Sequence, residues 1–386
     1  MNSTASWISS PEVLLLAVLL LAVGVVVWLS LRGRGKKPGE DAYTEALEAL
    51  VDGNLRLAVQ KLKEAVRENS SNIKAYLILG NVLRERGMHG HALRIHRELT
   101  LRESLTPQQR AEVQRALMYD YAAAGDIERA IQSGHRFLEE TKSVGRDDLL
   151  FLLSLYEKKE NWSGALELSK KYSKVLGPAF RKRQALYLVF QGNQLVAQGH
   201  DKEGRVKFKE ALKLDPDCVA ATYYLGKSYL EADRLEEAAQ VWRQLCEKHP
   251  EKAYLVFAEL EKVWYELGRF NDAEQLYTRL MQQNAGKDRA ALALARIYSK
   301  KGEYDSALEI LEQAQNGAPT PETMALRLQV LWNKNQYKQA ASQAMEFFEK
   351  QAMQAQKNFV CQKCGFVTTE PAWRCPQCGA IDSFAL

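Results

Sequence analysis

The chain has 386 residues, more than a single hydrophobic core usually organises, so we expect several domains or an array of repeats. Apolar residues make up 46% and charged residues 26%, a balance that excludes disorder over most of the chain. The net charge is only +5, and Lys and Arg are scattered among Asp and Glu, which argues against a nucleic-acid-binding protein.

The first feature along the chain is an apolar segment long enough to cross a bilayer. Val13 to Leu29 is a run of seventeen residues without a charge, about 26 Å as a helix. Residues 1–12 contain no Lys or Arg, which a cleaved signal peptide would need, whereas four basic residues follow the segment. Positive charge stays on the cytoplasmic side. We therefore predict a non-cytoplasmic N-terminus (1–12), a transmembrane helix (13–31) and a basic linker (32–41).

A self-similar region of about nine repeats, residues 42–357, comes next. A turn residue, usually Gly, is followed five positions later by a small residue, and neighbouring turns are 34 residues apart in the clearest cases. This is the tetratricopeptide pattern, in which each unit is a pair of antiparallel helices and the units stack into a solenoid. The aligned pairs are Gly53 and Ala58, Gly87 and Ala92, Gly125 and Ala130, Glu160 and Ala165, Gly199 and Gly204, Asp233 and Ala238, Gly268 and Ala273, Gly302 and Ala307, and Gln336 and Ala341.

Aromatic residues stand four positions before many of these turns, where they fill the gap between neighbouring units; Tyr121, Tyr156, Tyr229, Trp264, Tyr298 and Trp332 are the examples. The inner wall of such a solenoid is built from the first helix of each unit, and it binds peptides, helices or folded patches. Polar residues of these helices are the candidates for partner binding: Asn81, Arg84, Asn193, Lys227 and Arg296. Ordinary solvated surface is the alternative for each of them.

The C-terminal segment, residues 358–386, carries four of the six cysteines. Cys361 and Cys364 form one C-x2-C pair, Cys375 and Cys378 form a second, and a Gly follows each pair. Such spacing lets four thiolates surround one tetrahedral ion, and zinc and iron both accept this geometry. So small a segment has little core, so we expect the ion to supply much of its folding free energy. Four thiolates leave no open position for hydrolytic catalysis.

Two other motifs predict no function. Gly226-Lys227-Ser228 resembles the end of a phosphate-binding loop, but the required earlier glycine is Ala221. His89, His91 and His96 straddle a repeat turn, which favours a polar turn over a metal site.

The whole architecture resembles the lipopolysaccharide assembly protein B family of Gram-negative bacteria. The resemblance rests on Leu77 to Gly87 (LILGNVLRERG), Ala92 to His96 (ALRIH) and the cysteine-rich segment Cys361 to Cys378. It implies an all-α tetratricopeptide-repeat solenoid with a transmembrane helix and a rubredoxin-like metal knuckle. The four knuckle cysteines carry over as ligands of one metal ion, which is iron by resemblance; zinc is equally compatible with the residues.

The resemblance also implies a function without catalysis. Such proteins sit in the inner membrane with their bulk in the cytoplasm, and they present the lipid A-committing deacetylase to a membrane-anchored AAA protease. An inner-membrane regulator and lipopolysaccharide are further candidate partners. The alternatives are a general membrane-tethered scaffold for envelope or cytochrome biogenesis, and a redox protein if the knuckle holds iron.

Overall fold

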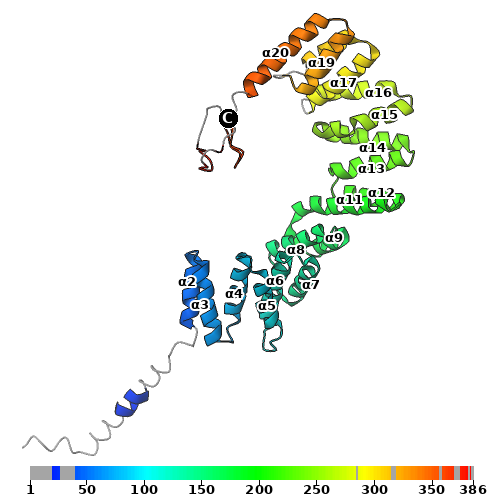
Figure 1. Ribbon diagram of the computed structural model, residues 1–386. Helices are drawn as coiled ribbons and strands as arrows, with labels where there is room; N and C mark the ends of the chain where they lie inside the picture. The colour runs from blue at the N-terminus through cyan, green and yellow to red at the C-terminus, as the bar shows by residue number, and fades with distance from the viewer. Residues whose placement is uncertain are drawn as a thin grey trace, which may run out of the picture. The chain divides into compact units, whose positions relative to one another are not determined.

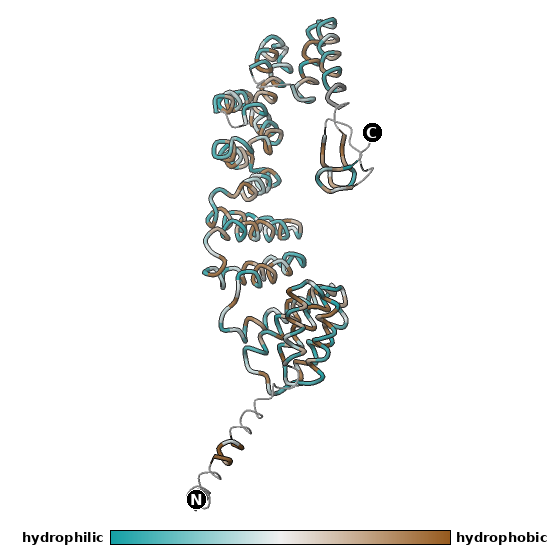
Figure 2. Tube along the Cα trace, turned by 90° about the vertical axis from the view of Figure 1, so that its left-hand side faces the viewer, coloured by the Kyte–Doolittle hydropathy of each residue, from teal (hydrophilic) through white to brown (hydrophobic). Residues whose placement is uncertain are grey.

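The computed structural model describes residues 20–26, 40–283, 286–313, 319–355, 359–368, 374–380 and 383. Most of these residues are helical, and the chain divides into two compact units, Met1–Pro178 and Ala179–Leu386. Of the predicted transmembrane segment, only residues 20–26 are described, and they form an exposed, apolar helical stretch (Figure 2). Within the described ranges, no helix is both long enough and apolar enough to span a membrane.

The first unit is built from helical hairpins, each formed by two consecutive helices (Figure 1). The hairpins are α2 (Glu40–Val51) with α3 (Leu55–Glu68), α4 (Ile73–Glu85) with α5 (His89–Thr100), α6 (Pro107–Ala123) with α7 (Ile127–Glu140), and α8 (Arg146–Lys158) with α9 (Trp162–Lys171). The short helix α10 (Ser173–Leu176) and the 3-10 helix η1 (Pro178–Phe180) follow. The second helix of each of the first three hairpins contacts the first helix of the next hairpin, so the hairpins stack.

The second unit continues the same pattern and ends in a small antiparallel ribbon. Its hairpins are α11 (Arg181–Ala197) with α12 (Asp201–Leu214), α13 (Val219–Glu231) with α14 (Leu235–Lys248), α15 (Phe257–Glu266) with α16 (Phe270–Gln282), α17 (Lys287–Lys301) with α18 (Tyr304–Gln313), and α19 (Pro321–Asn333) with α20 (Tyr337–Ala355). The 3-10 helix η2 (Pro250–Val256) lies between α14 and α15. Strand β1 (Phe359–Val360) pairs with β2 (Val367–Thr368), with Phe359 opposite Thr368.

The turn between the two helices of a hairpin takes a left-handed residue, as the repeat pattern predicts. Gly53 has φ 72° and Gly87 has φ 75°, values at which a side chain is strained. Glu160 and Asp233 adopt φ 52° and 56° at the same turn position without being glycine. The small residue five positions later is buried because the two helix backbones approach closely there; Ala58, Ala92, Ala130, Ala165, Ala238 and Ala307 are each 0% exposed.

In the last hairpin the repeat pattern lies one residue earlier in the chain than predicted. The left-handed turn residue is Asn335, with φ 62°, rather than Gln336. The buried small residue is accordingly Ala340, while Ala341 is exposed. Trp332 is 63% exposed, so the prediction that it fills a gap between units is wrong.

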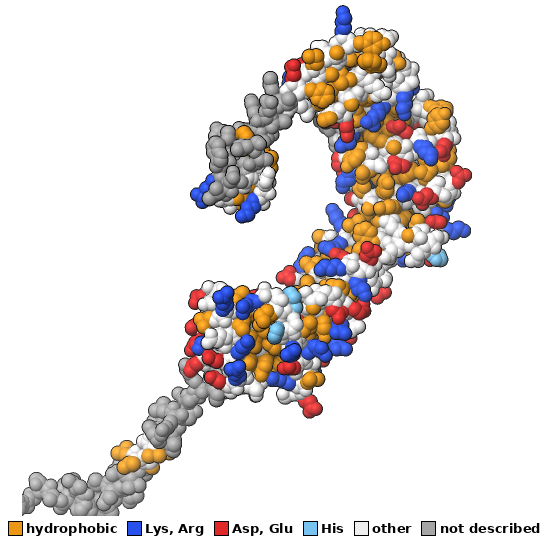
Figure 3. All heavy atoms as spheres, in the orientation of Figure 1, with side chains coloured by type: hydrophobic (Ala, Val, Ile, Leu, Met, Phe, Trp, Pro, Cys, Tyr) orange, Lys and Arg blue, Asp and Glu red, His pale blue; other side chains and the backbone are white. Residues whose placement is uncertain are grey.

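Hydrophobic and hydrophilic residues alternate along the helices (Figure 2), and the buried residues of the described part of the chain are mostly apolar. One core cluster joins α2 to α5 around Ala46, Leu62 and Leu79, and a second joins α4, α5 and α6 around Leu99 and Val113. On the face shown in Figure 3, Lys and Arg are interspersed with Asp and Glu.

Candidate metal centre and helical groove

The first cysteine pair sits in a tight turn that the backbone closes on itself. Cys361 N–H donates to the carbonyl of Phe366 at 2.8 Å, and Gly365 N–H donates to the carbonyl of Cys361 at 2.8 Å. Gly365 has φ 75°, a value that residues with a side chain rarely adopt. The Gly that the sequence places after the pair is therefore what permits the turn.

The second cysteine pair repeats this geometry. Cys375 N–H donates to the carbonyl of Ala380 at 2.8 Å, Gly379 N–H donates to the carbonyl of Cys375 at 2.9 Å, and Gly379 has φ 69°. In each pair the first cysteine, Cys361 or Cys375, is buried and the second is exposed. The two turns are thus equivalent halves of one site.

The four sulfurs are close enough to share one ion. All four Sγ atoms lie within 4.8 Å of one another, with Cys361 to Cys378 at 3.8 Å and Cys364 to Cys375 at 3.6 Å. A tetrahedron with metal–sulfur bonds of about 2.3 Å has sulfur–sulfur edges of about 3.8 Å. The cluster therefore supports a four-thiolate metal site, and the geometry suits zinc and iron alike.

The surroundings favour the thiolate form at one of these positions. The Ser383 hydroxyl lies 3.1 Å from Cys361 Sγ, and its hydrogen bond lowers the pKa of Cys361 to about 6. Phe359, Phe366 and Ala380 pack against the two buried cysteines. The thiolate is the form that binds metal, so this environment fits a ligand role. Trp373, two residues before Cys375 in the sequence, lies outside the described residues.

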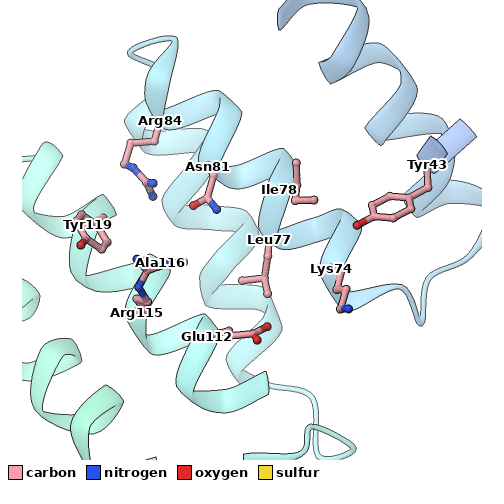
Figure 4. A pocket seen from close by; sticks show the side chains of 10 residues that line it. All are labelled: Tyr43, Lys74, Leu77, Ile78, Asn81, Arg84, Glu112, Arg115, Ala116 and Tyr119. Atoms are coloured by element: carbon pink, nitrogen blue, oxygen red, sulfur yellow. The ribbon is translucent and has the colours of Figure 1, made fainter. Parts of the chain in front are cut away.

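A second candidate site is a groove between the first helices of three hairpins in the first unit (Figure 4). Its volume is about 360 Å³, and α2, α4 and α6 provide its walls. The lining residues are Tyr43, Lys74, Leu77, Ile78, Asn81, Arg84, Glu112, Arg115, Ala116 and Tyr119. Two predicted partner-binding residues, Asn81 and Arg84, lie together here.

The other three predicted residues lie on first helices of the second unit, Asn193 on α11, Lys227 on α13 and Arg296 on α17. Lys227 is exposed and forms a loose ion pair with Glu231 at 4.0 Å. This arrangement is typical of a solvated helix face.

Two arginines that line the groove form hydrogen bonds with buried carboxylates on the side away from the cavity. Arg84 Nη1 donates to Asp120 Oδ1 at 2.7 Å, and Asp120 is completely buried. Arg115 Nε donates to Asp148 Oδ1 at 2.6 Å, and Asp148 is also buried. A charge-assisted hydrogen bond to a buried partner restricts the rotation of a long side chain. Both guanidinium groups are thereby fixed in the wall of the groove.

Tyr119 links the two arginine pairs. Its hydroxyl donates to Asp148 Oδ1 at 2.8 Å, and its ring stacks on Phe151 with ring centres 4.2 Å apart. The Arg84 and Arg115 guanidinium carbons each lie 5.5 Å from the ring centre, within range of a cation–π interaction. Burial, followed by the Asp148 contact, raises the pKa of Tyr119 to about 12, so it remains a hydrogen-bond donor at neutral pH.

The prediction that His89, His91 and His96 form a polar turn is wrong for His96. The three neighbouring histidines all lie in α5, and His96 is completely buried. Its Nδ1 lies 2.5 Å from Asp120 Oδ2, and its Nε2 lies 3.2 Å from the carbonyl of Leu77. A carboxylate therefore faces one ring nitrogen and a backbone carbonyl faces the other, so both polar atoms of the buried ring have a partner. His96, Asp120 and Arg84 thus form one buried network behind the groove.

A repeat comparison could have located His96. It follows Gly80 by sixteen residues, as Trp242 follows Gly226, and Trp242 Nε1 likewise donates to a backbone carbonyl, that of Tyr223, at 3.2 Å. His96 therefore occupies a core position of the repeat that elsewhere holds a large aromatic side chain.

These features are those of a mostly helical, tetratricopeptide-repeat-like solenoid with a C-terminal rubredoxin-like metal-binding ribbon. Tetratricopeptide-repeat profiles match residues 191–253 and 265–330, and the profile of the rubredoxin metal binding domain matches residues 359–385. The predicted solenoid and knuckle are thereby confirmed.

Similarity to individual proteins extends over most of the chain and is more specific than the profile matches. The chain is 23% identical over 341 residues to lipopolysaccharide assembly protein B of Escherichia coli (strain K12), covering 88% of this chain and 87% of the relative. It is also 23% identical to the protein of that name from Haemophilus influenzae, covering 82% of this chain and 80% of the relative. The predicted resemblance to the lipopolysaccharide assembly protein B family is confirmed. A solved structure of Naa15/Naa10 bound to HypK-THB covers 81% of this chain and 58% of that chain with 16% identity and a TM-score of 0.41, too low to indicate function.

Proposed function

We propose that this protein is a non-catalytic adaptor of lipopolysaccharide assembly. The observation that carries the proposal is the match to lipopolysaccharide assembly protein B, which extends over 88% of the chain. The stacked hairpins also support it, because a tetratricopeptide-repeat solenoid offers extended binding surface rather than reactive groups.

The cysteine cluster has a structural role in this proposal. Cys361, Cys364, Cys375 and Cys378 hold one ion, whose binding contributes most of the folding free energy of the ribbon, residues 358–386. The sulfur–sulfur distances of 3.6 and 3.8 Å support the assignment. Four thiolates occupy all four coordination positions of a tetrahedral ion, so no position is open for a substrate.

The N-terminal segment anchors the protein in the inner membrane, with the repeats of residues 42–357 on the cytoplasmic side. The uncharged run Val13 to Leu29 and the basic residues after it support this topology. An anchor concentrates the solenoid and its client beside membrane partners, and a short tether corresponds to an effective concentration on the order of millimolar.

The client is the deacetylase that commits precursor to lipid A, and the membrane partner is an anchored AAA protease that degrades it. The adaptor holds the deacetylase near the protease and thereby limits lipopolysaccharide synthesis. The resemblance to the family supports this assignment, and the tethered solenoid supplies a physical means for it.

The test measures deacetylase half-life in cells after synthesis is stopped. Depletion of the protein should lengthen that half-life and raise lipopolysaccharide, and the full-length chain should restore both. A chain with an unrelated single-pass anchor in place of residues 13–31 separates simple tethering from a specific contact in the membrane. An unchanged deacetylase half-life after depletion would refute the adaptor role.

A further inference from the structure

The groove between α2, α4 and α6 has a row of hydrogen-bond donors along one wall. Lys74, Asn81 and Arg84 all come from α4 and face the same cavity (Figure 4). Ten residues separate Lys74 from Arg84, about 15 Å along a helix. An extended peptide of four or five residues spans the same length, whereas a single small anion does not. The length of the row therefore indicates a peptide.

Donors of this groove are available to a ligand. Within the described part of the chain, Lys74 is exposed and has no carboxylate partner, and the Asn81 amide makes no hydrogen bond to another residue. Arg115 faces the row from α6, and its side chain is half exposed. Its contact with Asp148 uses Nε, which leaves the two terminal nitrogens for another acceptor.

The arginines are fixed before a ligand binds. Burying a carboxylate costs free energy that a hydrophobic core residue would not cost. The chain nevertheless buries Asp120 and Asp148, and each fixes one arginine in the groove wall at 2.7 and 2.6 Å. Prior fixing of donors reduces the entropy lost on binding. The buried carboxylates of Asp120 and Asp148 therefore favour a ligand-binding role for the two arginines over the role of an ordinary exposed ion pair.

We propose that this groove binds an extended acidic segment of a client protein. Asp and Glu side chains of the segment accept from the row Lys74, Asn81 and Arg84 and from Arg115 opposite it. Its apolar side chains contact Leu77 and Ile78, which also line the groove. The proposal rests on the proposed adaptor function, since it names the place where a client segment docks and the chemistry that the segment carries.

One lining residue provides an internal check. Glu112 is the single acid among the described residues that line the groove. It opposes an acidic ligand, so neutralising it should strengthen binding, whereas loss of Arg115 should weaken binding. A variant that merely unfolds the groove cannot produce both effects.

The experiment passes amidated octapeptide pools over the immobilised full-length chain in detergent. One pool has Glu fixed at alternate positions, the second has Gln there and the third has Lys, with the other positions random. The Glu pool should be retained at least tenfold better than the Gln pool, and retention should fall as salt rises. Individual peptides recovered from it then serve for affinity measurements.

Arg115→Gln should weaken those peptides about tenfold, the effect of one charge-assisted hydrogen bond. Glu112→Gln should tighten them several-fold. The matched control is Arg129→Gln in α7, an arginine outside the groove that is 62% exposed and also paired, with Asp126. This control should leave the affinity unchanged.

Equal retention of the Glu and Gln pools, or no retention of any pool, would overturn the proposal. So would binding to vesicles of phosphatidylglycerol that Arg115→Gln abolishes, because the groove would then recognise lipid phosphates. If the peptides fail to bind while deacetylase turnover still depends on the protein, only this inference fails and the adaptor function stands.

Discussion

Gly80 in α4 lies directly against the buried ring of His96, and an alanine there should destabilise the first unit. A Cβ atom at Gly80 would lie 2.3 Å from His96 Nε2 and 2.4 Å from Cε1. Real Cβ atoms do not approach ring atoms that closely, so the ring must move by about 1 Å or more. The ring cannot move freely, because Asp120 lies 2.5 Å from its other nitrogen.

The magnitude follows from two opposing contributions. Replacing Gly by Ala inside a helix gains about 1 kcal/mol of intrinsic helix stability. Displacing His96 breaks its contact with a completely buried carboxylate, and breaking such a pair costs about 3–5 kcal/mol. Gly80→Ala should therefore lose about 2–4 kcal/mol in the free energy of opening of helices α4 to α6.

Hydrogen exchange measured by mass spectrometry in increasing urea is the suitable assay, because a repeat solenoid unfolds locally rather than in one step. The matched control is Gly90→Ala in α5, where an added Cβ meets nothing within 4 Å. That variant should be neutral or gain about 0.5 kcal/mol. In a His96→Ala background, Gly80→Ala should no longer destabilise, because the obstructing ring is gone.

Hydrogen-exchange protection of α4 that is equal in Gly80→Ala and in the unaltered chain would refute a clash with His96. A penalty that persists in the His96→Ala background would also refute it, because the destabilisation would then have another source.

Three further substitutions test the ribbon, a surface ion pair and the corrected repeat phase. Cys361→Ser should reduce bound zinc or iron well below one equivalent by elemental analysis and expose the ribbon to protease, since three thiolates no longer close the site; full metal content would contradict it. The hydrogen bond from Lys301 lowers the pKa of Glu274 below 4.5, so Glu274 stabilises the fold at neutral pH and this contribution is lost as pH falls through the lowered pKa. Glu274→Gln should cost about 0.5 kcal/mol at neutral pH and nothing in strong acid, and a penalty independent of pH would contradict it. Ala340→Leu should cost about 1–3 kcal/mol by overpacking, whereas Ala341→Leu, at an exposed position, should be neutral in the same hydrogen-exchange assay. Equal effects of the two substitutions would contradict the assignment of Ala340 as the buried repeat residue.

The repeats and the cysteine cluster could be predicted from sequence because their signals are local. Gly53 and Ala58 are only five residues apart, so the left-handed turn and the small residue of the following helix can be recognised together in a short stretch of sequence. The two turns of the ribbon are equally local, since Cys361 and Gly365 are joined by a single backbone hydrogen bond. Such features require no knowledge of residues far along the chain.

The last repeat shows where a local signal fails. Asn335 replaces the turn glycine, so the strongest marker of phase is missing there. Trp332 then favoured an alignment displaced by one residue, because aromatic residues stand four positions before the turn in other units. Burial of Ala340 decides the register, and burial depends on packing against the rest of the hairpin.

The support of the groove could not be predicted from sequence, because its partners are distant along the chain. Arg84 and Asp120 are 36 residues apart, and His96 and Asp120 are 24 apart. A single sequence contains many such His, Asp and Arg residues at similar spacings, and only the stacking of α4, α5 and α6 brings these three together.

This network also couples the core to the groove. Asp120 accepts from His96 with one carboxylate oxygen and from Arg84 with the other, so a shift of the ring displaces the arginine support as well. The atoms nearest to a Cβ at Gly80 belong to His96, which does not line the groove, yet Gly80→Ala should weaken peptide binding in addition to destabilising α4. Arg115 has a separate support, Asp148, so its contribution to binding should survive the same substitution. A Gly80→Ala variant that loses stability but keeps full affinity would show that the support of Arg84 by His96 and Asp120 does not contribute to peptide binding.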